Sequence, residues 1–139
     1  MNHFTFIVVL LIFSLISCEK DDFKREEIIG NWTLEKIQID TISSGRLTGD
    51  SVMVYGNITY RINETDTLKI QYDTEVMFLM QFVPPDRIRY NSCPINFICI
   101  YSFPVEYRIT RLSSSEMVWQ KTVDYTEQRT LKETLSFSK

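Results

Sequence analysis

The residues of this sequence best suited to covalent or metal chemistry are one histidine and three cysteines. The only histidine, His3, stands in an apolar N-terminal segment, so the chain beyond that segment has no Ser-His or Cys-His pair for nucleophilic catalysis. Cys93 and Cys99 cannot form a closed zinc site without further ligands, and the isolated glycines form no phosphate-binding loop. We therefore expect no catalytic residues, no metal site and no cofactor. A pair of carboxylates is the one catalytic arrangement that the sequence does not exclude, although no spacing of acidic residues indicates such a pair.

The apolar N-terminal segment has the length of a secretory signal. Residues 4–16 include only two polar side chains, Thr5 and Ser14, whereas a membrane-spanning helix needs about 20 apolar residues. Residues 1–3 contain no lysine or arginine, which departs from the basic start of a typical signal. We expect residues 1–17 to be removed as a signal peptide.

The end of this segment, Leu15-Ile16-Ser17-Cys18, resembles the lipobox of bacterial lipoproteins, in which an aliphatic residue and two small or medium residues precede an obligatory cysteine. The resemblance implies that Cys18 becomes the first mature residue and carries acyl chains that anchor the protein stably in a membrane. The alternative is an ordinary secretory signal, or an uncleaved apolar tail, with Cys18 as a free thiol.

The charged run at 19–22 is similar to the export signal of Bacteroidota lipoproteins that reach the outer face of the outer membrane. A solvated tether would have the same composition, and both interpretations stay open. The expected location is the cell envelope, as an outer-membrane lipoprotein. Residues 18–26 are then the lipidated cysteine and charged tether, and 27–139 the folded domain.

The folded part has the composition of one globular domain. Hydrophobic residues make up 44% of the chain and charged residues 24%, and its length leaves no room for a second domain. The formal net charge is −3 and the basic residues are scattered, which argues against a nucleic-acid partner.

Short segments that alternate between apolar and polar residues follow one another after residue 30. The alternation is clearest in 68–73, 87–91 and 105–110, as in antiparallel strands with one buried face. Further strands are expected at 32–39, 51–60, 75–83, 116–123 and 130–137, with 97–103 as another candidate. Serine, glycine and aspartate in 40–50 predict a long loop there. Eight or nine strands of this kind predict a sandwich or a barrel.

Ile29-Gly30-Asn31-Trp32 follows a short helical segment expected at 23–29 and opens the first strand. It is similar to the G-x-W signature of lipocalins and of lipocalin-like domains in bacterial lipoproteins. The resemblance, carried by Gly30 and Trp32, implies an all-β fold: a single antiparallel up-and-down β-barrel of about eight strands, closed at one end by Trp32. In that family a basic residue near the last strand packs over the tryptophan, and Arg129 and Lys139 are candidates for it. A core tryptophan at the start of an ordinary strand is the alternative.

Cys93 and Cys99 are an even pair in a protein sent to an oxidising compartment, once Cys18 is acylated. A disulfide between them is the expected arrangement. Two buried thiols in strands are the alternative.

Two segments depart from plain alternation. Residues 75–82 are apolar on both faces, which predicts a strand covered on both sides or, less simply, a surface that meets a ligand. Glu133 falls between Leu131 and Leu135 on the apolar face of the last strand, where it would need a basic or hydrogen-bonding partner and would be a candidate for a binding site. A bulge that turns Glu133 outward is the simpler explanation.

A barrel of about eight strands can hold one small ligand or fill its interior with side chains. The expected function is binding or carrying a small apolar or amphipathic molecule in the barrel mouth of a membrane-anchored protein. The candidate ligand-binding residues are Met80, Phe82, Tyr90, Tyr107, Trp119 and Glu133. If large side chains fill the barrel, the alternative is a non-enzymatic structural or interaction module, or an accessory subunit of an envelope complex.

Overall fold

The computed structural model describes residues 23–95 and 97–139. The expected signal peptide, Cys18 and most of the charged tether lie outside these residues. The described chain forms one short helix and eight strands: α2 (Arg25–Ile28), β1 (Gly30–Ser43), β2 (Arg46–Ile62), β3 (Thr67–Gln71), β4 (Glu75–Val83), β5 (Arg87–Asn91), β6 (Pro104–Leu112), β7 (Glu116–Thr126) and β8 (Arg129–Ser138).

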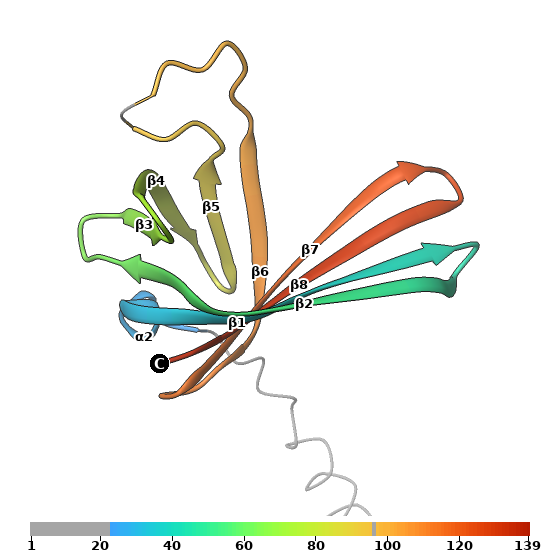
Figure 1. Cartoon of the computed structure of the whole chain (residues 1–139), viewed down its shortest axis with the longest axis horizontal. Helices are drawn as coiled ribbons and strands as arrows, with labels where there is room; N and C mark the ends of the chain where they lie inside the picture. The colour runs from blue at the N-terminus through green and yellow to red at the C-terminus, as the bar shows by residue number, and fades with distance from the viewer. Residues whose placement is uncertain (1–22, 96) are drawn as a thin grey trace, which may run out of the picture.

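The eight strands form a closed antiparallel barrel with up-and-down topology. Each strand pairs with the next in sequence, and β8 pairs with β1 to close the barrel (Figure 1). Closure leaves no free sheet edge along the paired region, which is how all-β domains of this size avoid edge-to-edge association. The predicted all-β barrel of about eight strands is therefore confirmed.

The core lies inside the paired part of the barrel, because alternate residues of each strand point inward. Trp32, Leu34, Met117 and Trp119 are among the residues with almost no exposed surface. Aromatic rings pack against one another in this core, and the Tyr60 and Phe137 rings meet edge to face with their centroids 4.9 Å apart. Residues 75–83 form one strand whose inward side chains contact the core, but the predicted cover on both faces is wrong, because Leu79 on the other face is 64% exposed.

The predicted long loop at 40–50 is wrong. β1 and β2 continue through this region and are joined by a tight turn at Ser44 and Gly45, both of which have positive φ. Positive φ at both central residues is typical of two-residue hairpin turns, because the twist of such a turn matches the right-handed twist of the two strands. The polar residues indicated a loop because this hairpin projects beyond the barrel, where both of its faces contact water.

The apolar segment 97–103 is not a strand, contrary to prediction. Its residues belong to the connection between β5 and β6, and Ile98 and Ile100 are almost fully exposed. Cys93 and Cys99 are joined by a disulfide in this connection, as expected. Pro94 has no backbone N–H to donate to a strand ladder, and Pro104 is the first residue of β6.

Candidate functional site

Four strands leave the barrel together as a curved sheet, because pairing at its two sides stops early. The pairing of β7 with β6 ends at the Arg108–Gln120 pair, and that of β2 with β3 ends at Thr59–Gln71. Beyond these points β2, β1, β8 and β7 pair only with one another. We call this four-stranded extension the arms. Figure 1 shows the arms diverging from β4, β5 and β6. We call this end, where pairing of the arms with β3 and β6 has stopped, the open end of the barrel.

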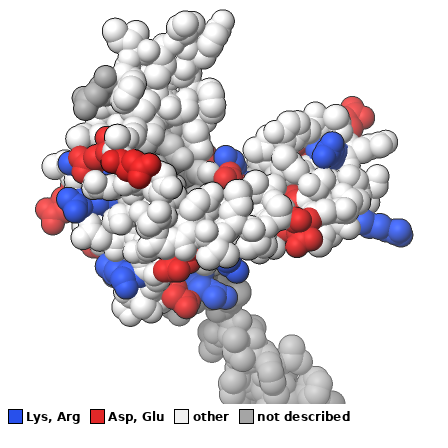
Figure 2. Space-filling view, viewed as in Figure 1, with Lys and Arg blue, Asp and Glu red and all other residues white. Residues whose placement is uncertain are grey.

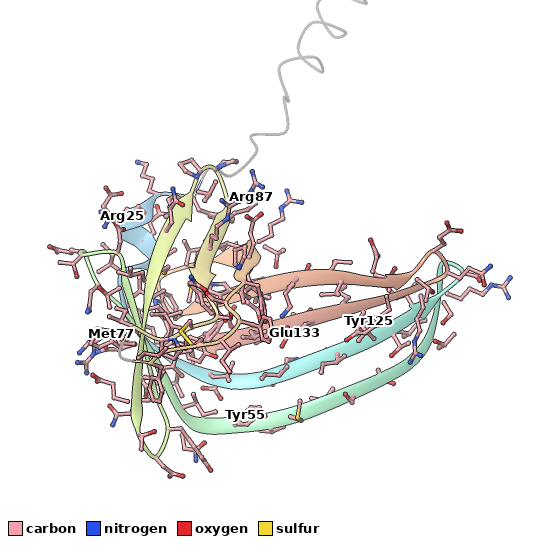
Figure 3. The ribbon with its side chains drawn as sticks, turned by 90° about the horizontal axis from the view of Figure 1, so that it is seen from above. Arg25, Tyr55, Met77, Arg87, Tyr125 and Glu133 are labelled. Atoms are coloured by element: carbon pink, nitrogen blue, oxygen red, sulfur yellow. A yellow bond between two sulfur atoms is a disulfide. The ribbon has the colours of Figure 1, made fainter. Side chains whose placement is uncertain are left out.

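The inner face of the arms continues the inner face of the barrel. On β8, Glu133 and Leu131 follow the buried Leu135 and Phe137 at alternate positions, without a bulge between them. A recess of about 160 Å³ lies on this face and is lined by Ile39, Lys121, Val123, Tyr125, Leu131 and Glu133. In Figure 3 Glu133 lies near the barrel and Tyr125 lies further out along the arms. The recess therefore extends from the core toward solvent over mainly apolar side chains.

Three polar side chains from adjacent strands meet at the barrel end of the recess. Lys121 Nζ lies 2.7 Å from Glu133 Oε2, and the Tyr107 hydroxyl donates a hydrogen bond to the same oxygen at 3.0 Å. Lys121 Nζ also lies 3.3 Å from the Tyr107 hydroxyl and 4.9 Å from the centre of its ring. Glu133 thus points inward, and the bulge that would have turned it outward is not present. Its basic and hydrogen-bonding partners are the ones that an inward carboxylate needs.

Burial raises the pKa of the tyrosines around this group. Burial is the main cause for Tyr107, and the nearby Tyr90 and Glu133 raise its pKa further because a phenolate there would repel them. Burial also dominates the raised pKa of Tyr60 and of Tyr90. These hydroxyls stay protonated at neutral pH, and that of Tyr107 donates its hydrogen bond to Glu133.

The structure brings together most of the residues predicted to bind a ligand, although several of them fill the barrel. Tyr90 stacks on Tyr107 with ring centroids 6.3 Å apart, and Tyr107 in turn lies 5.8 Å from Trp119. Met80 pairs with Tyr90 in the sheet, and both contribute to the core region. Phe82 pairs with Ile88 nearer the β4–β5 turn and does not line the recess.

The aromatic and apolar side chains next to the polar group are buried. Met80, Tyr107 and Trp119 are each at most 4% exposed. Among the described residues, the indole N–H of Trp119 is buried and has no hydrogen-bond acceptor. Tyr107 and Trp119 lie next to the polar group, whereas Met80 and Tyr90 line a separate recess of about 290 Å³. Of the predicted ligand-binding residues, only Glu133 lines the recess on the arms.

Sequence reasoning missed the apolar wall of the recess. Ile39, Val123 and Leu131 lie on it, together with Lys121, the partner of Glu133. One signal for Lys121 was available, since it is two residues from the buried Trp119 and so shares its face of β7. The recess itself was not predictable, because it requires the register between β7, β8 and β1.

The opposite end of the barrel is closed by α2, Trp32 and the C-terminal residue. The Trp32 indole N–H donates to the Ile28 carbonyl at 2.8 Å, and Lys139 Nζ lies 4.8 Å from the Trp32 ring centre. Of the two basic candidates, Lys139 is the one that packs over the tryptophan; Arg129 is at the far end of β8. Gly30 has a φ of 138° and lies against the Lys139 side chain, so a larger residue would disturb this end.

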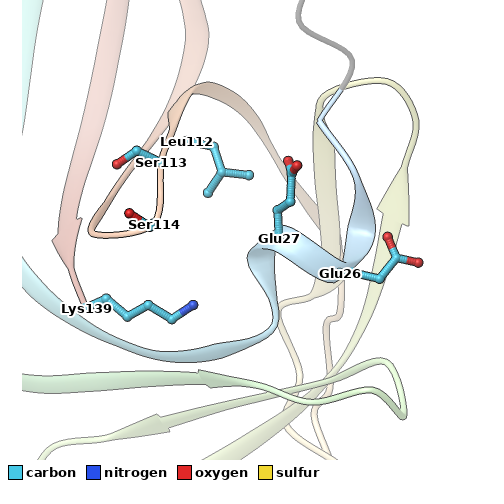
Figure 4. Close-up of a pocket in the computed structure, with 6 residues that line it drawn as sticks. All are labelled: Glu26, Glu27, Leu112, Ser113, Ser114 and Lys139. Carbon is cyan, nitrogen blue, oxygen red and sulfur yellow. The ribbon is translucent and has the colours of Figure 1, made fainter.

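A second recess, of about 380 Å³, lies at this closed end between α2 and the β6–β7 turn (Figure 4). It is lined by Glu26, Glu27, Leu112, Ser113, Ser114 and Lys139. Two of its charged residues already have structural contacts: the Glu27 carboxylate accepts a bond from the Lys24 backbone N–H, and Lys139 packs on Trp32. Because these charged side chains are engaged in contacts within the fold, we do not assign a ligand to it.

The connection between β5 and β6 forms one side of the open end. Residues 92–103, which form this connection, include no charged side chain, and Figure 2 shows the projection at the top of the molecule without basic or acidic groups. The Cys93–Cys99 bond closes a small ring in it, and the Ile95 backbone N–H donates to the Met77 carbonyl of β4 at 2.8 Å. These bonds restrain a loop whose large apolar side chains are exposed.

Comparisons with protein-family models, with curated proteins and with solved structures give no significant match. The similarity to lipocalins therefore rests on the residues and the barrel described above. Within residues 23–95 and 97–139, no helix is long and apolar enough to cross a membrane, and no three potential metal-binding side chains cluster.

Proposed function

We propose that this protein is a membrane-anchored, lipocalin-like lipoprotein that binds or carries a small amphipathic molecule at the open end of its barrel. The observation that supports ligand binding most strongly is the inner face of the arms. It presents partly exposed apolar side chains directly beside a half-buried polar group, with the Lys121 and Glu133 side chains 29% and 24% exposed. A ligand with an apolar part and a polar end would cover both.

The shape of the open end favours a ligand that lies along the arms over one enclosed in the barrel. Tyr107 and Trp119 are buried, whereas the recess of about 160 Å³ on the arms is open to solvent. From Glu133 back to the start of β8 at Arg129 the strand extends about 13 Å, enough to contact an acyl chain of medium length. Such a site suits transfer of the ligand to and from a membrane or a second protein.

Anchoring through acyl chains on Cys18 is the second part of the proposal. It is supported by Leu15-Ile16-Ser17-Cys18 at the end of the apolar segment and by the start of the fold only a few residues later, at Arg25. Phe23 is the fifth residue after Cys18, so the chain between them reaches about 18 Å at full extension. The barrel would then stay at the membrane surface of the cell envelope, where amphipathic ligands concentrate.

Mass spectrometry of the full chain purified natively from its own membranes tests both parts. We expect the intact mass to begin at Cys18 with acyl groups added, and organic extraction to release a small amphipathic compound. A variant with Val123 and Leu131 both replaced by serine should lose the compound and keep the acyl groups. An unmodified Cys18 would contradict the anchor, and identical extracts from both proteins would contradict the binding site.

One observation favours a second function, that of an interaction module without a small ligand. The connection between β5 and β6 exposes Ile98, Ile100 and Tyr101 by 84% or more, on a loop restrained by a disulfide. Exposed apolar side chains on a restrained loop are typical of surfaces that contact a partner. Cross-linking from this loop in intact cells, with no compound in the extracts, would favour this alternative over a carrier.

A further inference from the structure

The polar group at the end of the recess has balanced charge and unused hydrogen-bonding capacity. Glu133 Oε2 accepts both bonds, from Lys121 and from Tyr107, and Oε1 has no donor among the described residues. Lys121 has three N–H donors, of which two are directed at Glu133 and Tyr107. One acceptor and one donor therefore remain for a ligand at the same place.

This arrangement disfavours a ligand whose head group carries a full charge. A carboxylate that reached the free donor of Lys121 would lie close to Glu133, whose oxygen is only 2.7 Å from Nζ, and would be repelled by it. An ammonium group that reached Glu133 would meet Lys121 in the same way. An uncharged group such as a hydroxyl or an amide supplies both a donor and an acceptor, and it avoids both repulsions.

The surroundings place the apolar part of such a ligand. Ile39 pairs with Glu133 across β1 and β8, and Leu131 pairs with Val123 across β8 and β7. These side chains lie on the inner face and line the recess next to the polar group. Val123 is 42% exposed and Tyr125 66%, so apolar surface remains available for a chain to cover.

We propose that the recess selects single-chain amphiphiles with an uncharged head group that both donates and accepts hydrogen bonds, such as a primary alcohol or amide, over the carboxylate and the amine of equal length. This inference rests on the proposed function, because it assumes that the arms bind a ligand. The balanced pair of Lys121 and Glu133 is the selecting element.

Calorimetric titration of the full chain in nanodiscs tests the selection, with empty nanodiscs as the reference. The probes are decanol, decanoate and decylamine at pH 7, where the last two are charged. We expect decanol to bind about tenfold more tightly than either, a ratio typical of leaving one buried polar group unpaired. Lys121→Met should reverse the preference toward decylamine, because Glu133 is then an uncompensated negative charge.

Lys132→Met is the matched control, since it removes the same charge from the outer face of β8, next to Glu133. It should leave the order of the three affinities unchanged. Two results would overturn this inference but leave the proposed function standing. One is tighter binding of decanoate or decylamine than of decanol by the natural chain, and the other is an unchanged order of the three affinities in Lys121→Met. If none of the three probes bound, the inference and the proposed function would fall together.

Discussion

Replacing each of the two buried tryptophans by phenylalanine should have clearly different effects on stability. Trp32 and Trp119 are both fully buried, so each substitution removes a similar apolar area and leaves a similar cavity. These common losses largely cancel when the two variants are compared. The difference in stability then comes from the indole N–H groups, because one of them has a hydrogen-bond acceptor and the other has none among the described residues.

Trp32 donates its N–H to the Ile28 carbonyl at 2.8 Å, whereas the N–H of Trp119 has no acceptor among the described residues. Trp32→Phe leaves a buried carbonyl unpaired, at a cost of about 1–3 kcal/mol. Trp119→Phe removes a donor that was already unpaired and recovers a similar amount. We therefore expect Trp32→Phe to be the less stable variant by at least about 2 kcal/mol, or roughly 8 °C in Tm.

Urea denaturation followed by far-UV circular dichroism measures this difference without relying on tryptophan fluorescence. The two variants should show the same dependence of the unfolding free energy on urea, which would indicate similar unfolded states. The reasoning would be refuted if Trp119→Phe proved as destabilising as Trp32→Phe, since that would mean that the Trp119 N–H makes a bond of its own.

Three further predictions concern the closed end, the disulfide and the buried tyrosines. Lys139→Met should lower the unfolding free energy by about 1 kcal/mol, because it removes the cation from the Trp32 ring; an unchanged thermal midpoint would contradict this contact. Replacing Cys93 and Cys99 by serine should cost about 2 kcal/mol through the greater freedom of the unfolded chain, measured by urea denaturation; equal midpoints would show that the ring is not a restraint. Stability should also fall as the pH rises above about 10, because unfolded tyrosines ionise there while folded ones with raised pKa stay protonated. Absorbance at 295 nm should show exposed tyrosines titrating first, and a single titration before unfolding would argue against raised pKa values for the buried ones, which are Tyr60, Tyr90 and Tyr107.

The barrel was predictable because its determinants are local. Alternation in segments such as 105–110 marks one buried face per strand, and the turn residues mark where each strand ends. The position of Trp32 after Gly30 indicated which end is closed, and the structure places α2 and Lys139 around it. These features depend on neighbours in the sequence and not on the full set of strand pairings.

The open end was harder to predict, because it depends on where pairing stops between distant strands. The arms form since β7 separates from β6 after Gln120, and nothing in the local sequence indicates this point. Strands that leave the barrel expose both faces, so residues 40–50 read as a loop although they form a hairpin. In the same way, the apolar segment 97–103 read as a strand, because exposed apolar residues on a loop are unusual.

The partner of Glu133 shows the same limit on a smaller scale. An inward carboxylate indicated that a partner must exist, but Lys121 and Tyr107 come from two other strands. Their meeting requires the Lys121–Glu133 register between β7 and β8, which the sequence pattern alone leaves undetermined.

Methyl NMR of the full chain during a titration with decanol tests the central claim most directly. We predict that the resonances which shift belong to the inner face of the arms, namely Ile39, Val123 and Leu131. The methyls of Ile98 and Ile100 on the β5–β6 connection should stay unchanged. Shifts confined to that connection, or no shift at the inner face of the arms, would contradict ligand binding at the open end of the barrel.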